Sequence, residues 1–161
     1  ALPESFLYQA MVSKKLHRNF MGYVDKKSKI LIGLGPTSIS DSSISFIQNA
    51  KDNKMYEEIL NKDQLPITSG HTHNREDLLI QKLLLQLLCH QEMDLPDKSL
   101  IPYWENIEKE LEEFHNEGLI DLKSTHLKLK NVGRGFVRNV ALCFDYHHRS
   151  KNILVKFSQS I

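Results

Sequence analysis

The sequence has little cysteine. Only Cys89 and Cys143 occur among its 161 residues, and no CxxC or CxxxCxxC motif is present. Both lie in apolar helical patterns far apart in the chain, which predicts buried, reduced thiols in a cytoplasmic protein rather than a disulfide. Without such a motif, this chain alone cannot hold a cysteine-ligated iron–sulfur cluster.

Long hydrophobic runs and an excess of charge of one sign are also missing. No uncharged apolar stretch reaches 18 residues, so we expect no membrane-spanning segment. The start, Ala-Leu-Pro-Glu-Ser, has neither signal-peptide features nor an initiator Met, which predicts a processed product or a piece of a longer chain. Lys and Arg number 21 against 20 Asp and Glu, which argues against nucleic acid or an anionic membrane as a partner.

What is present predicts an α+β fold that is predominantly helical. Hydrophobic residues make up 40% of the chain, enough for a core. Residues 1–50 carry most strand and turn signals and are expected to form a β-rich extension, with a strand over 17–24 and a buried strand over 30–32. The hydroxyl-rich stretch 37–43 favours irregular structure, because such side chains bond to their own backbone.

Residues 51–161 are expected to form a mainly helical domain. Helices are predicted over 53–61, over 75–90 behind an Asn74 cap, from Pro102 to Gly118, and from Gly135 to about His148. Residues 63–74 are expected to be a loop, and 119–122 and 126–129 to pair as two short strands. This order is compatible with a winged-helix-like arrangement. The helix before the ribbon is strongly acidic, which disfavours binding to DNA phosphates.

Three residue patterns are candidate sites. The pair His71-x-His73 suits zinc when it lies on a strand, but Asp77 falls on the next helix and no third ligand is supplied nearby, so the expectation is no metal site. Gly33-x-Gly35 lacks the third glycine and the lysine of the standard phosphate-binding loops; it suits either close backbone packing or approach to an adenine or sugar edge.

An arginine stripe is the third pattern. On a continuous helix Arg134, Arg138, Asp145 and Arg149 would lie on one face, which suits either carboxylate binding or a solvated, internally paired surface. No nucleophile motif places a catalytic triad, and no residue of this chain is expected to be catalytic.

Several strings resemble a known family. They are His17-Arg18-Asn19-Phe20-Met21-Gly22-Tyr23, Leu31-Ile32-Gly33-Leu34-Gly35, Ser38-Ile39-Ser40, the run from Gly133 to Asp145 (GRGFVRNVALCFD), and the ending Phe157-Ser158-Gln159-Ser160-Ile161. Together they resemble the part of oxygen-independent coproporphyrinogen III oxidases that follows the radical-SAM barrel, in order and with similar gaps. The first and last thirds of the chain carry specific matches, whereas the middle third matches mainly in its helical pattern.

The resemblance implies the C-terminal part of an enzyme that oxidatively decarboxylates coproporphyrinogen III to protoporphyrinogen IX in haem biosynthesis. It implies S-adenosylmethionine and a [4Fe-4S] cluster in the parent enzyme, with the cluster cysteines in a barrel outside this chain. That N-terminal barrel of the same polypeptide and coproporphyrinogen III are the implied partners. The piece itself is expected to cover the cofactor and substrate site and to be inactive alone.

Site residues also follow from the resemblance. Ile39 matches an isoleucine that contacts S-adenosylmethionine, and Phe20 matches an aromatic residue beside the cofactor. Met21 stands where the common pattern has Gln, so a polar contact from that position is not expected. The substrate carries four propionates, and the arginines expected to bind them are Arg138, Arg134 and Arg18.

One alternative stays open: a helical interaction module, or a haem-binding module of a related radical-SAM-like protein. If the piece stands apart from its barrel, residues 1–50 are expected to expose an apolar patch that favours self-association.

Overall fold

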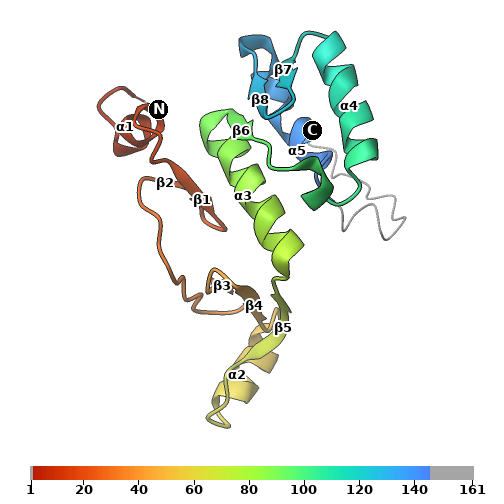
Figure 1. Ribbon diagram of the computed structural model, residues 1–161. Helices are drawn as coiled ribbons and strands as arrows, with labels where there is room; N and C mark the ends of the chain where they lie inside the picture. Colours follow the sequence, from red (N-terminus) through yellow and green to blue (C-terminus); the bar gives the residue numbers. More distant parts are fainter. Residues whose placement is uncertain (1, 146–161) are drawn as a thin grey trace, which may run out of the picture. The chain divides into compact units, whose positions relative to one another are not determined.

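The structure, a computed structural model, describes residues 2–145 (Figure 1). The chain divides into two compact units, and the boundary follows Leu78, inside the long helix α3 (Arg75–His90). The boundary between two domains predicted at residues 50 and 51 lies earlier in the chain than this division. In the part of the chain described, no helix is long and apolar enough to cross a membrane.

The first unit opens with helix α1 (Phe6–Val12), whose first turn is capped by the Ser5 hydroxyl. Two short antiparallel strands follow, β1 (His17–Asn19) and β2 (Gly22–Val24). The single strand predicted over 17–24 is therefore a hairpin. The Asn19 side chain accepts a hydrogen bond from the Met21 N–H, and Gly22 has a φ of 123°, so the chain reverses at these residues.

A three-stranded antiparallel sheet forms the rest of the first unit. Its strands are β3 (Ile39–Asp41), β4 (Ser45–Asn49) and β5 (Ile67–Thr72), in the order β3-β4-β5. Helix α2 (Asn53–Leu60) joins β4 to β5 and confirms the predicted helix at 53–61. Its Met55 and Leu60 side chains are more than two-fifths exposed.

Three local predictions in this unit are wrong. The predicted loop 63–74 contains β5, and the stretch 37–43 contains β3, because pairing with β4 satisfies backbone groups that local hydroxyls were expected to engage. The predicted buried strand 30–32 makes only an isolated bridge from Leu31 to Asp41. Its neighbours Ile30 and Ile32 are 65% and 72% exposed, so an apolar run here did not signal burial.

The second unit contains the hydrophobic core. After α3 come β6 (Glu92–Asp94), a 3-10 turn (Lys98–Leu100), α4 (Trp104–Asn116), β7 (Ile120–Lys123), β8 (His126–Leu129), a second 3-10 segment (Asn131–Phe136) and α5 (Val137–Leu142). Helices and sheet pack around one cluster. It comprises Ile80, Leu83, Leu87, Met93, Leu95, Ile101, Trp104, Ile107, Leu111, Ile120, Leu127, Leu129, Val140, Cys143 and Phe144.

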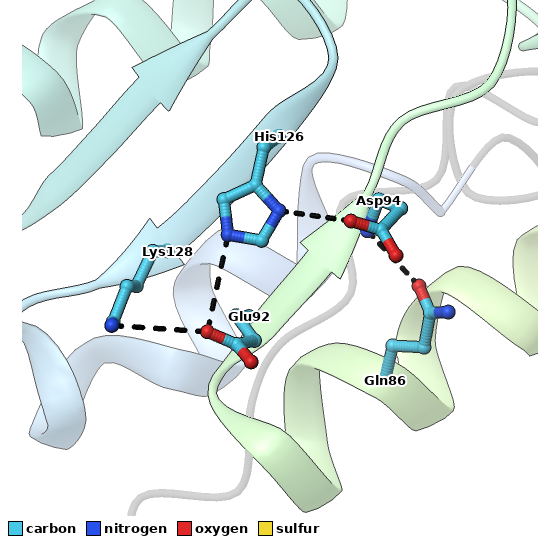
Figure 2. A network of polar contacts seen from close by, with 5 residues as sticks. All are labelled: Gln86, Glu92, Asp94, His126 and Lys128. Atoms are coloured by element: carbon cyan, nitrogen blue, oxygen red, sulfur yellow. Dashed lines mark hydrogen bonds and ion pairs between the residues drawn. The ribbon is translucent and has the colours of Figure 1, made fainter.

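The predicted two-stranded ribbon is the edge and centre of a three-stranded sheet, in the order β6-β8-β7. Figure 2 shows the side chains that join β6 to β8: His126 Nδ1 lies 3.0 Å from Asp94 Oδ1, and Lys128 Nζ lies 3.8 Å from Glu92 Oε2. The Asp94 N–H also donates to Gln86 Oε1 on α3. Strand β6 was not predicted from the sequence; it pairs with β8 through three residues.

The structure confirms the mixed α+β class, and the two central helices lie where they were predicted. Gly118, with a φ of 74°, follows the end of α4 as expected of a helix stop. The winged-helix-like character of the second unit stays a prediction.

Candidate functional site

The strand register brings Ile39 onto the same sheet face as a group of aromatic and titratable residues. Ile39 lies opposite Gln48, Asp41 opposite Phe46, and Phe46 opposite His71. Residues paired directly across antiparallel strands point to one side, and positions two apart share that side. We call this side, with Ile39, Asp41, Phe46 and His71, the Phe46 face.

Phe20 joins this face from outside the sheet. Its ring meets the Phe46 ring edge to face, with centroids 4.7 Å apart. On the other side, Phe46 meets the His73 ring in the same manner at 4.3 Å. The two residues expected at the cofactor, Phe20 and Ile39, are thus brought to one face of a single sheet. Phe20 is 49% exposed, so part of its ring is accessible to a ligand.

The loop before β3 is held by one buried amide. The Asn49 Nδ2 atom donates to the carbonyl oxygens of Gly33 and Gly35 at 3.2 and 3.0 Å, and to Ser38 Oγ at 3.1 Å. The Gly35 N–H donates to the Tyr56 hydroxyl. Several bonds from separate elements therefore fix the Gly-x-Gly turn that leads into Ile39.

Gly33 leaves no room for a side chain. A Cβ there would lie 2.7 Å from the Ile39 carbonyl oxygen. Gly35 has a φ of 94°, which favours glycine. Close backbone packing, one of the two explanations offered for these glycines, is what the structure shows at Gly33, where the backbone of Ile39 lies beside the turn.

Strand β1 supplies two titratable residues, His17 and Arg18. Burial lowers the pKa of His17, and the Lys27 ammonium lowers it further, while the Asp41 carboxylate opposes both. Arg18 follows, with its guanidinium carbon 5.6 Å from the centroid of the Tyr23 ring. Its Nε atom is buried and has no hydrogen-bond partner within the described residues. Arg18 is therefore held in place with donor capacity left over, as a carboxylate-binding residue requires.

The other two arginines belong to the second unit. Arg134 lies in the 3-10 segment and Arg138 in α5, and both are exposed. The stripe geometry expected of one continuous helix does not hold, because a 3-10 segment turns by about 120° per residue rather than 100°. Arg149 lies outside the described residues. The helix predicted from Gly135 to about His148 is too long: α5 ends at Leu142, and Cys143, Phe144 and Asp145 follow it as non-helical residues.

A cluster that sequence reasoning discounted lies at the end of β5. The structure brings Asp77, in the first turn of α3, to His71 and His73. Asp77 was not expected to be a ligand because it falls on the next helix. With His71 on a strand and α3 beginning at Arg75, the chain turns at once and brings the carboxylate back.

Many large hydrophobic side chains of the first unit are exposed, and most of these belong to residues 1–50. The most exposed large hydrophobic side chains are Leu34 at 85%, Met21 at 83%, Leu65 at 78% and Phe6 at 77%. All belong to the first unit, whereas the continuous core cluster belongs to the second.

Three known proteins that this chain resembles share one name. No family model matches the chain. It is 33% identical over 155 residues to the oxygen-independent coproporphyrinogen III oxidase of Helicobacter pylori J99, covering 92% of this chain and 34% of that protein. The enzymes of the same name from Pseudomonas aeruginosa and Escherichia coli K12 are 32% and 28% identical, over 94% and 100% of this chain.

A solved structure of the same enzyme family is also similar to this chain. The Escherichia coli coproporphyrinogen III oxidase HemN, described as a radical SAM enzyme, superposes with a TM-score of 0.81 at 26% identity, over 91% of this chain and 35% of that one. This chain therefore spans about a third of the length of the relatives that it matches. Over most of its own length, the chain is homologous to the C-terminal part of oxygen-independent coproporphyrinogen III oxidases.

Proposed function

We propose that this chain is the C-terminal part of an oxygen-independent coproporphyrinogen III oxidase, which converts coproporphyrinogen III to protoporphyrinogen IX in haem biosynthesis. In this proposal the chain covers the cofactor and substrate site and carries no catalytic residue. The observation that supports it most directly is the Phe46 face, where Ile39 and Phe20 come together from separate segments.

An iron–sulfur cluster does not fit this chain. Cys89 and Cys143 are its only cysteines, both are buried in the second unit, and no cluster motif exists. In the proposed enzyme the cluster and S-adenosylmethionine supply radical chemistry from a barrel in the same polypeptide. The residues of this chain bind the cofactor and shield it from water. The half-exposed ring of Phe20 and the side chain of Ile39 offer apolar contact to the adenosyl group.

The exposed apolar side chains of the first unit support the barrel as a partner. Leu34 and Met21 would each bury most of a large side chain on contact, which stabilises an interface by about 25 cal/mol per Å² of apolar surface removed from water. We therefore assign this surface to contact with the barrel. The isolated 161-residue chain is expected to bind a hydrophobic dye and to self-associate, and a dye-negative monomer would contradict this assignment.

Arginines supply the proposed carboxylate contacts. The substrate carries four propionates, and the planar guanidinium binds carboxylates through two parallel hydrogen bonds. Arg18, Arg134 and Arg138 are the proposed partners. Arg138 is exposed, so its replacement should leave folding unchanged and affect binding alone.

The decisive experiment places single substitutions in the complete oxidase polypeptide and measures anaerobic turnover and S-adenosylmethionine affinity. Ile39→Ala should weaken S-adenosylmethionine binding by about tenfold, a loss of roughly 1.4 kcal/mol expected for removing a buried aliphatic contact. Ile47→Ala is the matched control, because Ile47 lies on β4 one residue from Phe46 and so points to the opposite face. Equal effects of the two substitutions would overturn the assignment of Ile39.

A second arm tests the arginines. Arg138→Ala should raise the KM for coproporphyrinogen III, and Arg138→Lys should recover only part of the loss, because lysine keeps the charge but not the planar pair of donors. Arg75→Ala, at an exposed arginine at the start of α3, is the control. An unchanged KM in Arg138→Ala would remove this residue from the substrate site.

A further inference from the structure

The end of β5 and the first turn of α3 form a cluster of three metal-ligating side chains. One ligand atom from each of His71, His73 and Asp77 lies within 4.8 Å of the other two. His71 Nε2 and Asp77 Oδ2 are already 2.7 Å apart. His71 and His73 lie two residues apart along the extended chain and therefore point to the same side, toward which the helix brings Asp77.

Hydrogen bonds from a helix cap fix the position of the carboxylate. Asn74 Oδ1 accepts from the Asp77 N–H at 2.7 Å, and Asp77 Oδ2 accepts from the Asn74 N–H at 2.9 Å. This reciprocal pair holds the start of α3 and leaves the Asp77 side chain only 6% exposed. A carboxylate restrained in this way is a better ligand than a freely rotating one, because little side-chain freedom is lost on binding.

His73 supplies an independent observation. Both of its ring nitrogens are buried, and neither has a hydrogen-bond partner within the described residues. Its ring is held edge on against Phe46 and lies 5.4 Å, centroid to centroid, from the ring of His71. Leaving such a polar atom buried and unsatisfied is unfavourable, because the atom loses its water without gaining another partner. A cation bound to one of these nitrogens removes part of that cost.

We propose that His71, His73 and Asp77 bind a divalent transition-metal ion of the zinc class. Two imidazoles and one carboxylate favour zinc over magnesium or calcium, which prefer oxygen ligands throughout. Three protein ligands leave a fourth tetrahedral position for water, and the His71 side chain, 49% exposed, lies where solvent reaches the cluster. The bound ion ties the end of β5 to the first turn of α3, and its His71 ligand belongs to the Phe46 face.

This site is independent of the proposed oxidase activity, because it uses none of the residues assigned to cofactor or substrate. It is therefore tested on the 161-residue chain without S-adenosylmethionine or porphyrin. After treatment with a chelator, the chain is titrated with Zn²⁺ by calorimetry and with Co²⁺ by visible absorption. We expect one ion per chain and Co²⁺ bands typical of tetrahedral nitrogen and oxygen ligation, without thiolate charge-transfer absorption.

Two ligand variants and two controls locate the ion. His71→Ala and Asp77→Asn should each weaken Zn²⁺ binding by at least about tenfold. The side-chain amide introduced by Asp77→Asn still offers an oxygen to the Asn74 N–H, so this substitution removes the charge of the ligand while keeping the cap. Thr72→Ala, between the two histidines but on the opposite side of β5, should bind Zn²⁺ unchanged.

The second control addresses another place where a histidine meets acidic side chains. His126→Ala disrupts the contacts with Asp94 and Glu92 in the second unit and should leave the stoichiometry and affinity unchanged. Circular dichroism confirms folding of each variant. Absence of stoichiometric binding, or equal affinity in His71→Ala, Asp77→Asn and the unsubstituted chain, would overturn the proposal and leave the His71–Asp77 contact as an extension of the helix cap.

Discussion

Phe20 and Phe46 meet edge to face with their ring centroids 4.7 Å apart, and this contact joins the β1–β2 hairpin to the three-stranded sheet of the first unit. The two rings come from segments that are well separated in the sequence. Few residues of the first unit are fully buried, so we expect this ring contact to be important for holding the hairpin against the sheet.

Replacing Phe46 with leucine should weaken the contact between the β1–β2 hairpin and the sheet without leaving a cavity at position 46. The substitution keeps apolar volume but removes the aromatic pair, at a cost of about 0.5–1.5 kcal/mol. Hydrogen exchange should accelerate at the amides of β1 and β2 while those of β7 and β8 stay protected. Phe6→Leu, at a ring 77% exposed, is the control and should leave both sets unchanged. Unaltered exchange in the hairpin of Phe46→Leu would show that other contacts hold it.

Asn49→Ala should loosen the Gly-x-Gly turn before Ile39. The buried amide makes three hydrogen bonds, and its removal leaves carbonyl oxygens of the turn without that donor, at a cost of about 1–3 kcal/mol. Urea denaturation of the first unit, followed by tyrosine fluorescence and hydrogen exchange, measures the loss. The matched control is Gln48→Ala, whose single bond to Thr37 is exposed and should contribute less than about 0.5 kcal/mol.

Gly133 and Gly135 should respond oppositely to alanine. A Cβ at Gly133 would lie 2.0 Å from the Leu119 carbonyl oxygen, whereas a Cβ at Gly135 would meet nothing within 4 Å. Gly133→Ala forces backbone movement beside β7 and should destabilise the second unit by about 1–3 kcal/mol or more. Gly135→Ala should change the free energy of unfolding by less than about 1 kcal/mol, in the stabilising direction if the helical backbone is kept. Similar thermal midpoints for the two variants would contradict the close approach at Gly133.

Glu108 should make the second unit sensitive to acid. Its hydrogen bond with Lys98 lowers the pKa of the carboxyl below its ordinary value of 4.5, so the unfolded chain binds more protons than the folded one in that range. The stabilisation is therefore complete above about pH 4.5 and is lost as the pH falls through the lowered pKa.

Denaturation midpoints measured between neutral and strongly acidic pH test this linkage. Glu108→Gln should flatten the acid limb of the stability curve, while Glu112→Gln, at an exposed acid on the same helix, should leave the limb as it is. An identical pH dependence in Glu108→Gln and the unsubstituted chain would show that the Lys98 contact does not couple to folding.

Local sequence signals predict several elements correctly because their causes lie within a few residues. Asn74 is expected to cap the helix 75–90, and it does so through the Asp77 N–H. Gly118 is expected to end the helix before the ribbon, and its positive φ lies there. Caps, stops and helical periodicity depend on neighbours in the chain, and these are visible in one sequence.

The errors fall where pairing between distant segments decides the structure. The stretch 37–43 around β3 is rich in Ser and Thr, and β5 contains Thr, Ser and Gly; both patterns predict irregular structure, yet each strand pairs with β4. The buried strand expected at 30–32 makes one bridge only. An apolar run in the sequence does not indicate whether another element covers it, and here Ile30 and Ile32 are exposed. Strand pairing satisfies backbone groups irrespective of side-chain propensity, and it overrode the local preference here.

Residue identities and local patterns were enough to predict the family resemblance, the α+β class, the two central helices and the choice of Ile39 and Phe20 as candidate site residues. These rest on residue identity and local spacing, which folding does not alter. Contacts between distant segments became visible only in the folded chain: Phe20 and Ile39 share one sheet face, Asn49 fixes the turn before Ile39, and Asp77 reaches His71 and His73. Each of these contacts depends on strand register and on the immediate turn from β5 into α3, and a shift of one residue in register would send the side chains to opposite faces.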